Sequence, residues 1–387
     1  MAITQHDLSY YLNTARELAE RVAENADRIG RECQIPTELA AEMADKGFFR
    51  LLLPRRLGGA ELEHPDFLRI LEIFAAADGS TAWTLNQNNV WSTNSVRLSD
   101  KTAQEIWSEQ RTVVTNGPPT SSAVAVPVEG GYKLSGRWFF SSGSSHATWI
   151  GALAPVRPTG KQPTDSEDYR VLLLPKSEVN FLPDTWEVSG LRGTASFGFE
   201  INDVFVPNDR TYEQNGDPLN GGPLYCIPRT LLFACGFSTV ALGIARASLT
   251  TAINLSSTRT PARVIGLMQE QKTTQRLIGE AEAILRSARA FLQQSASAVW
   301  QSACKTQTLS TEERVNLRLA STHGIRQAAQ VVDIAYGLVG SGSIFPTNPI
   351  HRRFQDIHVI TQHIQGRPTH YETAGQFLLG LEPEGNY

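Results

Sequence analysis

The stretch GGYKLSGRWFFSSGSSHATWI, residues 130–150, decides how the chain divides. Aromatic and apolar residues in its first half give way to glycine and serine, which is typical of a strand that ends in a polar turn. Comparable runs, TVVTN, YRVLLLP and ASFGFEINDVFVP, lie between residues 111 and 212 and are separated by Gly, Pro, Asn and Asp. The sequence therefore predicts a central β domain of about a hundred residues.

Helical patterns flank this β domain on both sides. Pro36 marks the start of one early helix, and Gly47 stands where its C-terminal cap is expected. After the β domain, long amphipathic patterns cover residues 231–303 and 311–339. In the first early helix, apolar residues recur at three- and four-residue steps and form one stripe: Leu12, Ala15, Leu18, Ala19, Val22 and Ala26.

The order of helices, strands and helices indicates an α+β protein, because neither alternating βαβ units nor an internal repeat is found. We expect an N-terminal helical domain over residues 1–111, a central β domain over 112–222 and a C-terminal helical bundle over 223–387. The glycine-rich GLVGSGS follows a helical run rather than a strand, and the chain has neither a P-loop lysine nor a G-x-S-x-G elbow. Motifs for nucleotide phosphates and for serine hydrolases are therefore missing.

Charge and composition exclude several classes of protein. The 387 residues include 35 Lys and Arg against 39 Asp and Glu, a formal net charge of −4 that argues against a nucleic-acid binder. The N-terminus has no basic segment followed by an apolar run, and no stretch approaches the roughly 20 apolar residues of a membrane span. The four cysteines are far apart and indicate free thiols. We therefore expect a cytoplasmic protein that binds neither nucleic acid nor a membrane.

Three segments contain residues suited to chemistry. In the turn after Gly136, serines and His146 lie close to three aromatic residues, a combination that suits a planar heterocycle; the alternative is a simple strand and polar turn. In SGLRGTASFGF, residues 189–199, three glycines near Arg192, Thr194 and Ser196 allow close approach of the backbone to a ligand; the alternative is a β-turn with a solvated arginine.

The third segment is HRRFQDIHVITQHIQG, residues 351–366. It places Asp356, His358 and His363 in one late helical stretch, with Asp356 and His363 two turns apart on the same face. The spacing of the three residues is poor for a metal held on one helix face, so no metal site is predicted. A histidine here is more often an ordinary helix residue whose hydrogen bonds are satisfied.

Taken together, these segments resemble the acyl-CoA dehydrogenase superfamily and, within it, the two-component flavin monooxygenases that oxidise 4-hydroxyphenylacetate, dibenzothiophene or indole. The resemblance implies an N-terminal helical domain, a central β-barrel-like domain and a C-terminal four-helix bundle, assembled as a homotetramer. It spans nearly the whole chain, through ELAAEMADKGFFRLLLPRRLGG, DGSTAW, GGYKLSGRWFFSSG, GLRGTAS, VGSGSIFPTNPIHRRFQD and AGQFLLGLEP.

One position favours the monooxygenase branch. Acyl-CoA dehydrogenases commonly carry a glutamate base eight residues after the Asp of an R-D motif, and counting from Asp356 gives Ile364, which cannot abstract a proton. Glu372 in HYETAG keeps an acyl-CoA dehydrogenase as the alternative, with Glu372 as its base and an electron-transfer partner. A third alternative is a catalytically idle homologue.

The resemblance also implies a mechanism. A separate NAD(P)H:flavin reductase supplies reduced flavin, which reacts with O2 to give a C4a-hydroperoxide that hydroxylates an aromatic substrate. By resemblance, Ser142, or Ser141 under an alignment shifted by one residue, donates a hydrogen bond to flavin N5. His363 matches the histidine that serves the distal peroxide oxygen, and His146 is a weaker candidate for the same role.

Further cofactor contacts follow from the resemblance. Arg259 resembles the arginine that reaches a neighbouring subunit's flavin phosphate. Tyr336 stands where dehydrogenases have a glutamine, so the usual contact with the adenine is not predicted here. FAD is expected, with FMN as the alternative. The remaining cofactor-binding residues that we expect are Trp138, Phe139, Phe140, Ser141, Ser142, Thr194, Gly340, Ser341 and Gly342.

The substrate is expected to be a small aromatic or heteroaromatic molecule. Phenol-hydroxylating relatives often carry a histidine twelve residues after the first glycine of G-S-x-A-W, where this chain has Trp91. Without that base an electron-rich ring such as indole fits better, with Trp83, Trp91 and Asn89 as candidate contacts. The alternative for this run is ordinary helix packing, with the asparagines on the solvated face.

Overall fold

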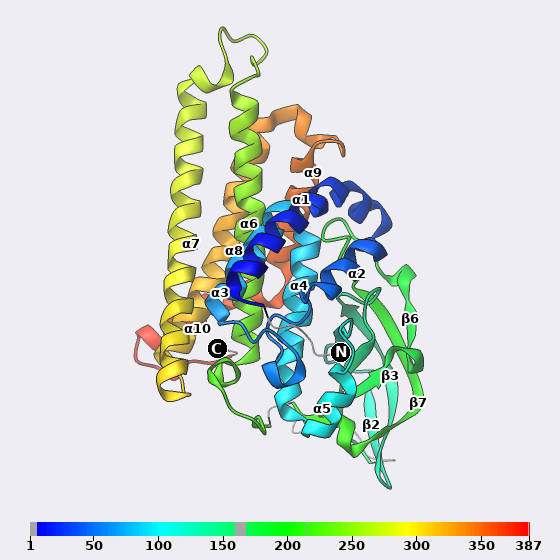
Figure 1. The fold of residues 1–387 in the computed structure, drawn as a ribbon. Coiled ribbons are helices and arrows are strands. Elements are labelled where there is room, and N and C mark those ends of the chain that lie inside the picture. Colours follow the sequence, from blue (N-terminus) through cyan, green and yellow to red (C-terminus); the bar gives the residue numbers. More distant parts are fainter. Residues whose placement is uncertain (1–5, 159–167, 215, 386) are drawn as a thin grey trace.

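The computed structural model describes residues 6–158, 168–214, 216–385 and 387. It confirms the α+β class, with helices at both ends of the chain and strands between them (Figure 1). The N-terminal region consists of α1 (Leu8–Glu32), α2 (Thr37–Asp45), α3 (His64–Ala77), α4 (Gly79–Ser92) and α5 (Asp100–Trp107). As expected, α2 begins directly after Pro36, and Gly47 follows its end with a φ of +83°.

The strands form two four-stranded sheets that pack face to face. One sheet has the order β1-β4-β5-β8 and the other β2-β3-β7-β6. Trp138 of β3 and Phe199 of β7 are cross-strand neighbours in the second sheet, where their rings stack with centroids 5.0 Å apart. Both are fully buried, and Trp138 Nε1 donates to the carbonyl of Leu153 in the first sheet. The strands are β1 (Val114–Gly117), β2 (Val124–Val128), β3 (Gly131–Ser141), β4 (Trp149–Pro155), β5 (Tyr169–Pro175), β6 (Asn180–Leu182), β7 (Phe197–Pro207) and β8 (Thr211–Glu213).

The C-terminal helices share one hydrophobic core with the N-terminal helices. Gly243 permits the contact between α6 and α3, because a Cβ there would lie 2.4 Å from that of Ala75. Buried residues from Tyr11 in α1 to Ile360 in α9 belong to this single core. Figure 1 shows α1–α5 between the strands and the long helices α6–α8. The C-terminal helices are α6 (Arg229–Ser256), α7 (Lys272–Thr306), α8 (Thr311–Val339), α9 (Pro349–Gln362) and α10 (Thr369–Leu378).

Helix α6 lies at the centre of this core. Within the described residues, α6 alone is long and apolar enough to pass for a membrane span, but 78% of its most apolar window is buried inside the fold. Such burial is typical of the core helix of a globular protein.

The late helix ends earlier than the sequence predicted. α9 stops at Gln362, and His363 has an extended backbone with φ −68° and ψ 147°. The two-turn argument for Asp356 and His363 is therefore wrong, because His363 is not in the helix that contains Asp356.

A buried histidine at the start of α3 makes the stability of the protein depend on pH. His64 is fully buried, neither ring nitrogen has a hydrogen-bond partner among the described residues, and burial lowers its pKa to about 4. Between pH 4 and 6.5 the His64 side chain is therefore protonated in the unfolded chain but not in the folded one. At pH 5 this difference lowers the free energy of unfolding by about 2 kcal/mol, whereas at pH 8 it has no effect.

Replacing His64 by leucine is expected to remove its share of the acid sensitivity, while the shares of His146 and His363, whose pKa burial also lowers to about 4, remain. Thermal unfolding at pH 5 and pH 8 measures it: the difference between the two midpoints should shrink in His64→Leu. Replacing the exposed His358 by glutamine is the control and should leave the difference as it is in the unmodified protein. An unchanged pH difference in His64→Leu would contradict the assignment.

Candidate active site

The turn after β3 directs two adjacent serines to different partners. Ser141 Oγ donates to the carbonyl of Asn116 in β1 and lies 3.3 Å from Thr115 Oγ1. Ser142 Oγ instead accepts a hydrogen bond from Trp83 Nε1 at 3.2 Å and lies 2.8 Å from Ser196 Oγ. Ser141 therefore fastens the turn to the first sheet, and Ser142 faces the N-terminal helices.

Three aromatic rings from distant parts of the chain meet beside Ser142. Trp83 of α4 stacks on Phe237 of α6 with ring centroids 3.7 Å apart and an interplanar angle of 15°. His363 lies edge-on to both, with its ring centroid 5.0 Å from that of Trp83 and 4.9 Å from that of Phe237. The structure thus brings together the predicted Trp83, Ser142 and His363.

The hydrogen bond to His363 decides which of its nitrogens carries the proton. The backbone N–H of Gln365 donates to His363 Nδ1 at 3.3 Å, so the neutral ring carries its hydrogen on Nε2. Burial lowers the pKa of His363 to about 4, and the positive charge of Arg367 adds to the effect. At neutral pH, His363 is therefore an uncharged donor.

The other late residues serve different parts of the fold. Asp356 Oδ1 accepts the backbone N–H of Leu191 at 2.6 Å and so holds the 189–199 loop against α9. Burial, followed by the charge of Asp78, raises the pKa of Asp356 to about 7. His358 lies 2.9 Å from Asp333 on the surface. The structure therefore does not bring Asp356, His358 and His363 together.

Two of the three expected aromatic wall residues are exposed. Trp138 lies inside the β domain, and its Nε1 donates to the carbonyl of Leu153, so the expected contact with a cofactor is wrong for this residue. The register of β3 against β7 shifts between Trp138 and Ser141, which turns Phe139 and Phe140 outward. Phe140 is 69% exposed and lies edge-on to Trp186, with centroids 6.2 Å apart.

This arrangement fits a flavin. Phe140 presents an uncovered ring two residues before Ser142, and flat aromatic surface beside a few hydroxyl groups is what a planar heterocycle requires. Thr194 lies close to these groups, because its Oγ1 is 2.7 Å from Ser196 Oγ and its carbonyl accepts the N–H of Gly143 at 2.8 Å.

The expected nucleotide contacts form a second cluster at the far end of α6. Arg259 donates to the carbonyl of Val339 at 2.5 Å, directly before Gly340, whose φ is +63°. Phe237 lies near the start of α6 and Arg259 just past its end, so the helical rise puts the two clusters roughly 28 Å apart. Ser341 and Gly342 belong to the same turn as Gly340.

Three further candidates are held by packing or by hydrogen bonds within the fold. Asn89 uses both amide hydrogens on the carbonyls of Phe48 and Leu85, and its oxygen accepts two backbone N–H groups of residues 51 and 52, so no polar atom is left for a substrate. Trp91 packs in a different cluster, against Gly151. His146 is hydrogen-bonded to the backbone of Ile35, and burial lowers its pKa to about 4.

Two residues of this site, Phe237 and Trp186, were not predicted from the sequence, whereas Ser196 was named only as a neighbour of the glycine-rich turn. The signal for Phe237 was available, because Phe233 and Phe237 lie four residues apart and so share one face of α6. The contacts of Ser196 and Trp186 depend on loop geometry that periodicity does not describe.

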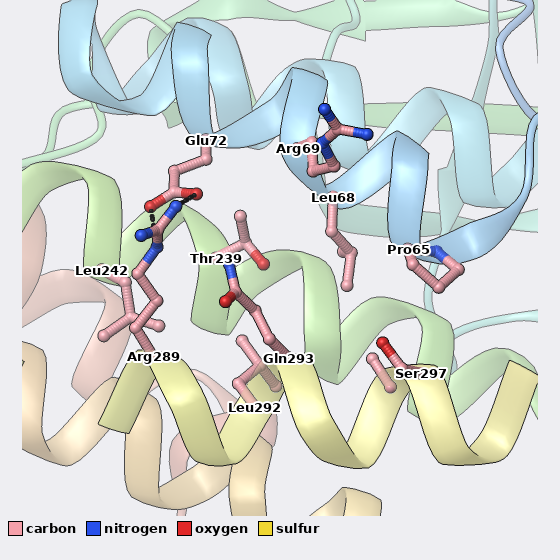
Figure 2. Close-up of a pocket in the computed structure, with 11 residues that line it drawn as sticks. Pro65, Leu68, Arg69, Glu72, Thr239, Leu242, Arg289, Leu292, Gln293 and Ser297 are labelled. Atoms are coloured by element: carbon pink, nitrogen blue, oxygen red, sulfur yellow. Dashed lines mark hydrogen bonds and ion pairs between the residues drawn. The ribbon is translucent and has the colours of Figure 1, made fainter. Parts of the chain in front are cut away.

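A separate hollow lies between α3, α6 and α7 (Figure 2). Leu68, Thr239 and Leu292 are among the residues that line it, and an ion pair between Arg289 and Glu72 lies at its side. None of the active-site residues named above lines this hollow.

Comparison with known proteins decides the family. Residues 7–107 match the acyl-CoA dehydrogenase N-terminal domain, and residues 235–368 match the acyl-CoA dehydrogenase C-terminal domain. An indole-3-acetate monooxygenase from Pseudomonas putida is 31% identical, with 92% of this chain and 90% of the relative covered. The chain belongs to the acyl-CoA dehydrogenase family.

Within the family, the chain lies in the flavin-dependent monooxygenase branch, as the sequence predicted. The oxygenase component of an FADH2-dependent resorcinol hydroxylase from Rhizobium is 26% identical over 92% of this chain and 90% of its own length. The fold matches the HsaA monooxygenase from M. tuberculosis with a TM-score of 0.89 and 24% identity, covering 98% of this chain and 99% of that one. XiaF from Streptomyces, solved with FADH2, also gives a TM-score of 0.89, with 20% identity and 98% of both chains covered.

Proposed function

We propose that this protein is the oxygenase component of a two-component system in which reduced FAD and O2 hydroxylate a small, indole-type heteroaromatic ring. The observation that carries the proposal is the meeting of Ser142, Trp83, Phe237 and the neutral His363 beside exposed aromatic surface. Reduced flavin, when bound, supplies the two electrons with which O2 is activated for transfer of one oxygen atom. A cytoplasmic NAD(P)H:flavin reductase would deliver it.

Residues of this protein would donate a hydrogen and hold the flavin. His363 holds its hydrogen on Nε2, because Nδ1 is already an acceptor, and so could donate it to an oxygen atom bound beside the ring. Ser142 would bond flavin N5, and Phe140 with Trp186 would lie along the flavin ring. Ser141 is less suited to N5, because its hydroxyl is committed to Asn116.

Similarity supports the choice of a ring that carries an N–H group. The amides that follow Trp83 on α4 do not add to it, because Asn86 Oδ1 lies against Gly236 of α6, where a Cβ would be 1.8 Å away. Gln87 donates to Asn116. The relative that is 31% identical is named for indole-3-acetate.

The alternative, an acyl-CoA dehydrogenase, needs a carboxylate base at the same site. Glu372 is exposed on α10, and no contact joins it to Ser142, Trp83 or His363 in the described part of the chain. We therefore favour the monooxygenase.

One experiment tests the proposal directly. The purified protein is mixed with FAD, a flavin reductase, NADH and ¹⁸O2, and with indole, indole-3-acetate, a phenol or a thiophene in turn. We expect one ¹⁸O atom in the product of an indole. Bleaching of bound oxidised flavin by an acyl-CoA, without oxygen incorporation, would favour the dehydrogenase. Absence of flavin binding in either redox state would overturn both readings.

The separation of the two clusters supports a site built from two subunits of a homotetramer. Since roughly 28 Å of α6 lies between Phe237 and Arg259, we assign Arg259 and Gly340 to the flavin of a neighbouring subunit. The guanidinium of Arg259 is suited to the diphosphate of FAD.

Mixed oligomers test this assignment. His363→Ala and Arg259→Ala subunits are each expected to be inactive alone, because each lacks one half of every site. After co-expression, a site that takes His363 from one subunit and Arg259 from its neighbour is complete, and random mixing restores activity to about one quarter. If mixing restores no activity while both proteins stay folded, both residues serve the same subunit's flavin.

A further inference from the structure

A chain of hydroxyl groups runs from the active site into the 189–199 loop. Trp83 Nε1 donates to Ser142 Oγ, Ser142 Oγ lies 2.8 Å from Ser196 Oγ, and Ser196 Oγ lies 2.7 Å from Thr194 Oγ1. Thr194 Oγ1 lies 2.8 Å from the carbonyl oxygen of Leu191. All four side chains are buried, so bulk water does not compete for these hydrogen bonds.

The carbonyl of Leu191, at one end of the hydroxyl chain, fixes the direction of every hydrogen bond in it. The carbonyl of Leu191 can only accept, so the single hydroxyl hydrogen of Thr194 points at it. Thr194 Oγ1 must then accept from Ser196, and Ser196 Oγ from Ser142. At the other end, the indole N–H of Trp83 can only donate, which agrees with this direction.

Ser142 is thereby left as an acceptor. Its only hydrogen is committed to Ser196, and one of its two lone pairs takes the N–H of Trp83. The second lone pair is the only hydrogen-bonding capacity that remains for a ligand. A ligand atom that carries hydrogen is therefore favoured at Ser142 over one that presents a lone pair.

We propose that Thr194 and Ser196 are positioning residues that orient the Ser142 hydroxyl as an acceptor, and that this orientation makes the site select reduced over oxidised flavin. The inference rests on the proposed function, which puts flavin N5 at Ser142. N5 carries a hydrogen in reduced flavin and a lone pair in oxidised flavin. If Ser142 donated its hydrogen to oxidised flavin, every hydrogen bond along the hydroxyl groups would reverse, and the bond from Thr194 to Leu191 would be lost.

The backbone conformation of the 189–199 loop allows the hydroxyl groups of Thr194 and Ser196 to bond. In an extended strand, side chains two positions apart point to the same side but are too far apart for their hydroxyls to bond. Thr194 and Ser196 lie just before β7, outside the strand. Ala195 between them has a φ of +45°, a left-handed conformation that is uncommon for alanine. The bend brings the two hydroxyl groups within 2.7 Å. Asp356 holds the same loop at Leu191, which carries the final acceptor.

Dissociation constants for FAD in both redox states test the proposal. They are measured anaerobically for reduced FAD and in air for oxidised FAD. In Ser196→Ala the hydrogen of Ser142 is released and can be donated to oxidised N5. We therefore expect oxidised FAD to bind more tightly and the preference for reduced FAD to fall by about tenfold, the equivalent of one neutral hydrogen bond.

Matched variants separate orientation from damage to the fold. Thr194→Val keeps the shape without the hydroxyl and should lower the preference, whereas Ser196→Thr and Thr194→Ser keep a hydroxyl and should restore it. Ser144→Ala, in the same turn but outside the hydroxyl chain, should leave the preference unchanged. A parallel loss of affinity for both redox states, or an unchanged ratio in Ser196→Ala, overturns the inference. An unmodified protein that binds neither form overturns the proposed function instead.

Discussion

Replacing His363 by alanine is expected to lower product formation by about 10²- to 10⁴-fold, the usual contribution of a positioned proton donor. Flavin binding should persist, because the hydroxyl and aromatic contacts to the cofactor do not involve this ring. NADH consumption should therefore continue, with its electrons recovered as H2O2. Product and H2O2 measured against NADH consumed give the coupling ratio that checks this expectation.

Two observations sharpen the test of His363. His358→Ala, on α9 but bonded to Asp333, is the matched control and should keep its coupling. Because burial and Arg367 lower the pKa of His363 to about 4, the ring stays neutral between pH 6 and 9, and its donor role should not titrate there. Full coupling in His363→Ala would remove this residue from the mechanism.

Replacing Ser142 and Ser141 separately is expected to give opposite defects. Ser142→Ala removes the acceptor for reduced flavin, so affinity for reduced FAD should fall by about tenfold and more electrons should escape as H2O2. Ser141→Ala leaves the Asn116 carbonyl without this hydrogen bond and should cost about 1 to 3 kcal/mol of stability while coupling persists.

Binding titrations, coupling ratios and thermal unfolding distinguish the two serines. The expected pattern is a binding and coupling defect with a small change in stability for Ser142→Ala, and the reverse for Ser141→Ala. The opposite pattern would move the contact with the cofactor to Ser141.

Much of the fold was predictable, because it depends on local patterns. The alternation of helical and strand-like texture predicted the order of elements, and Pro36 and Gly47 marked the ends of α2. The outward orientation of Phe140 was not predictable, since a register shift between Trp138 and Ser141 interrupts the alternation of side chains along β3.

The site was predictable only in part. Ser142 and His363 are 221 positions apart, and it was resemblance rather than periodicity that linked them. Their common neighbour Phe237 lies on α6, which is buried almost all round and so offers no polar face that would mark a functional side. The chain of hydroxyl groups depends on the left-handed backbone at Ala195, which no pattern in the sequence predicts.

The shared core of the two helical regions has a consequence for biosynthesis. Helices α1–α4 emerge from the ribosome before α6 and α9, which cover their apolar faces. At usual rates of translation the roughly 150 residues from α5 to the end of α6 take on the order of ten to thirty seconds to appear. The strands can fold in that interval, because they have a core of their own around Trp138. The apolar faces of the first helices stay exposed until α6 and α9 are synthesised. Chaperone demand during synthesis should accordingly be concentrated on the first hundred residues.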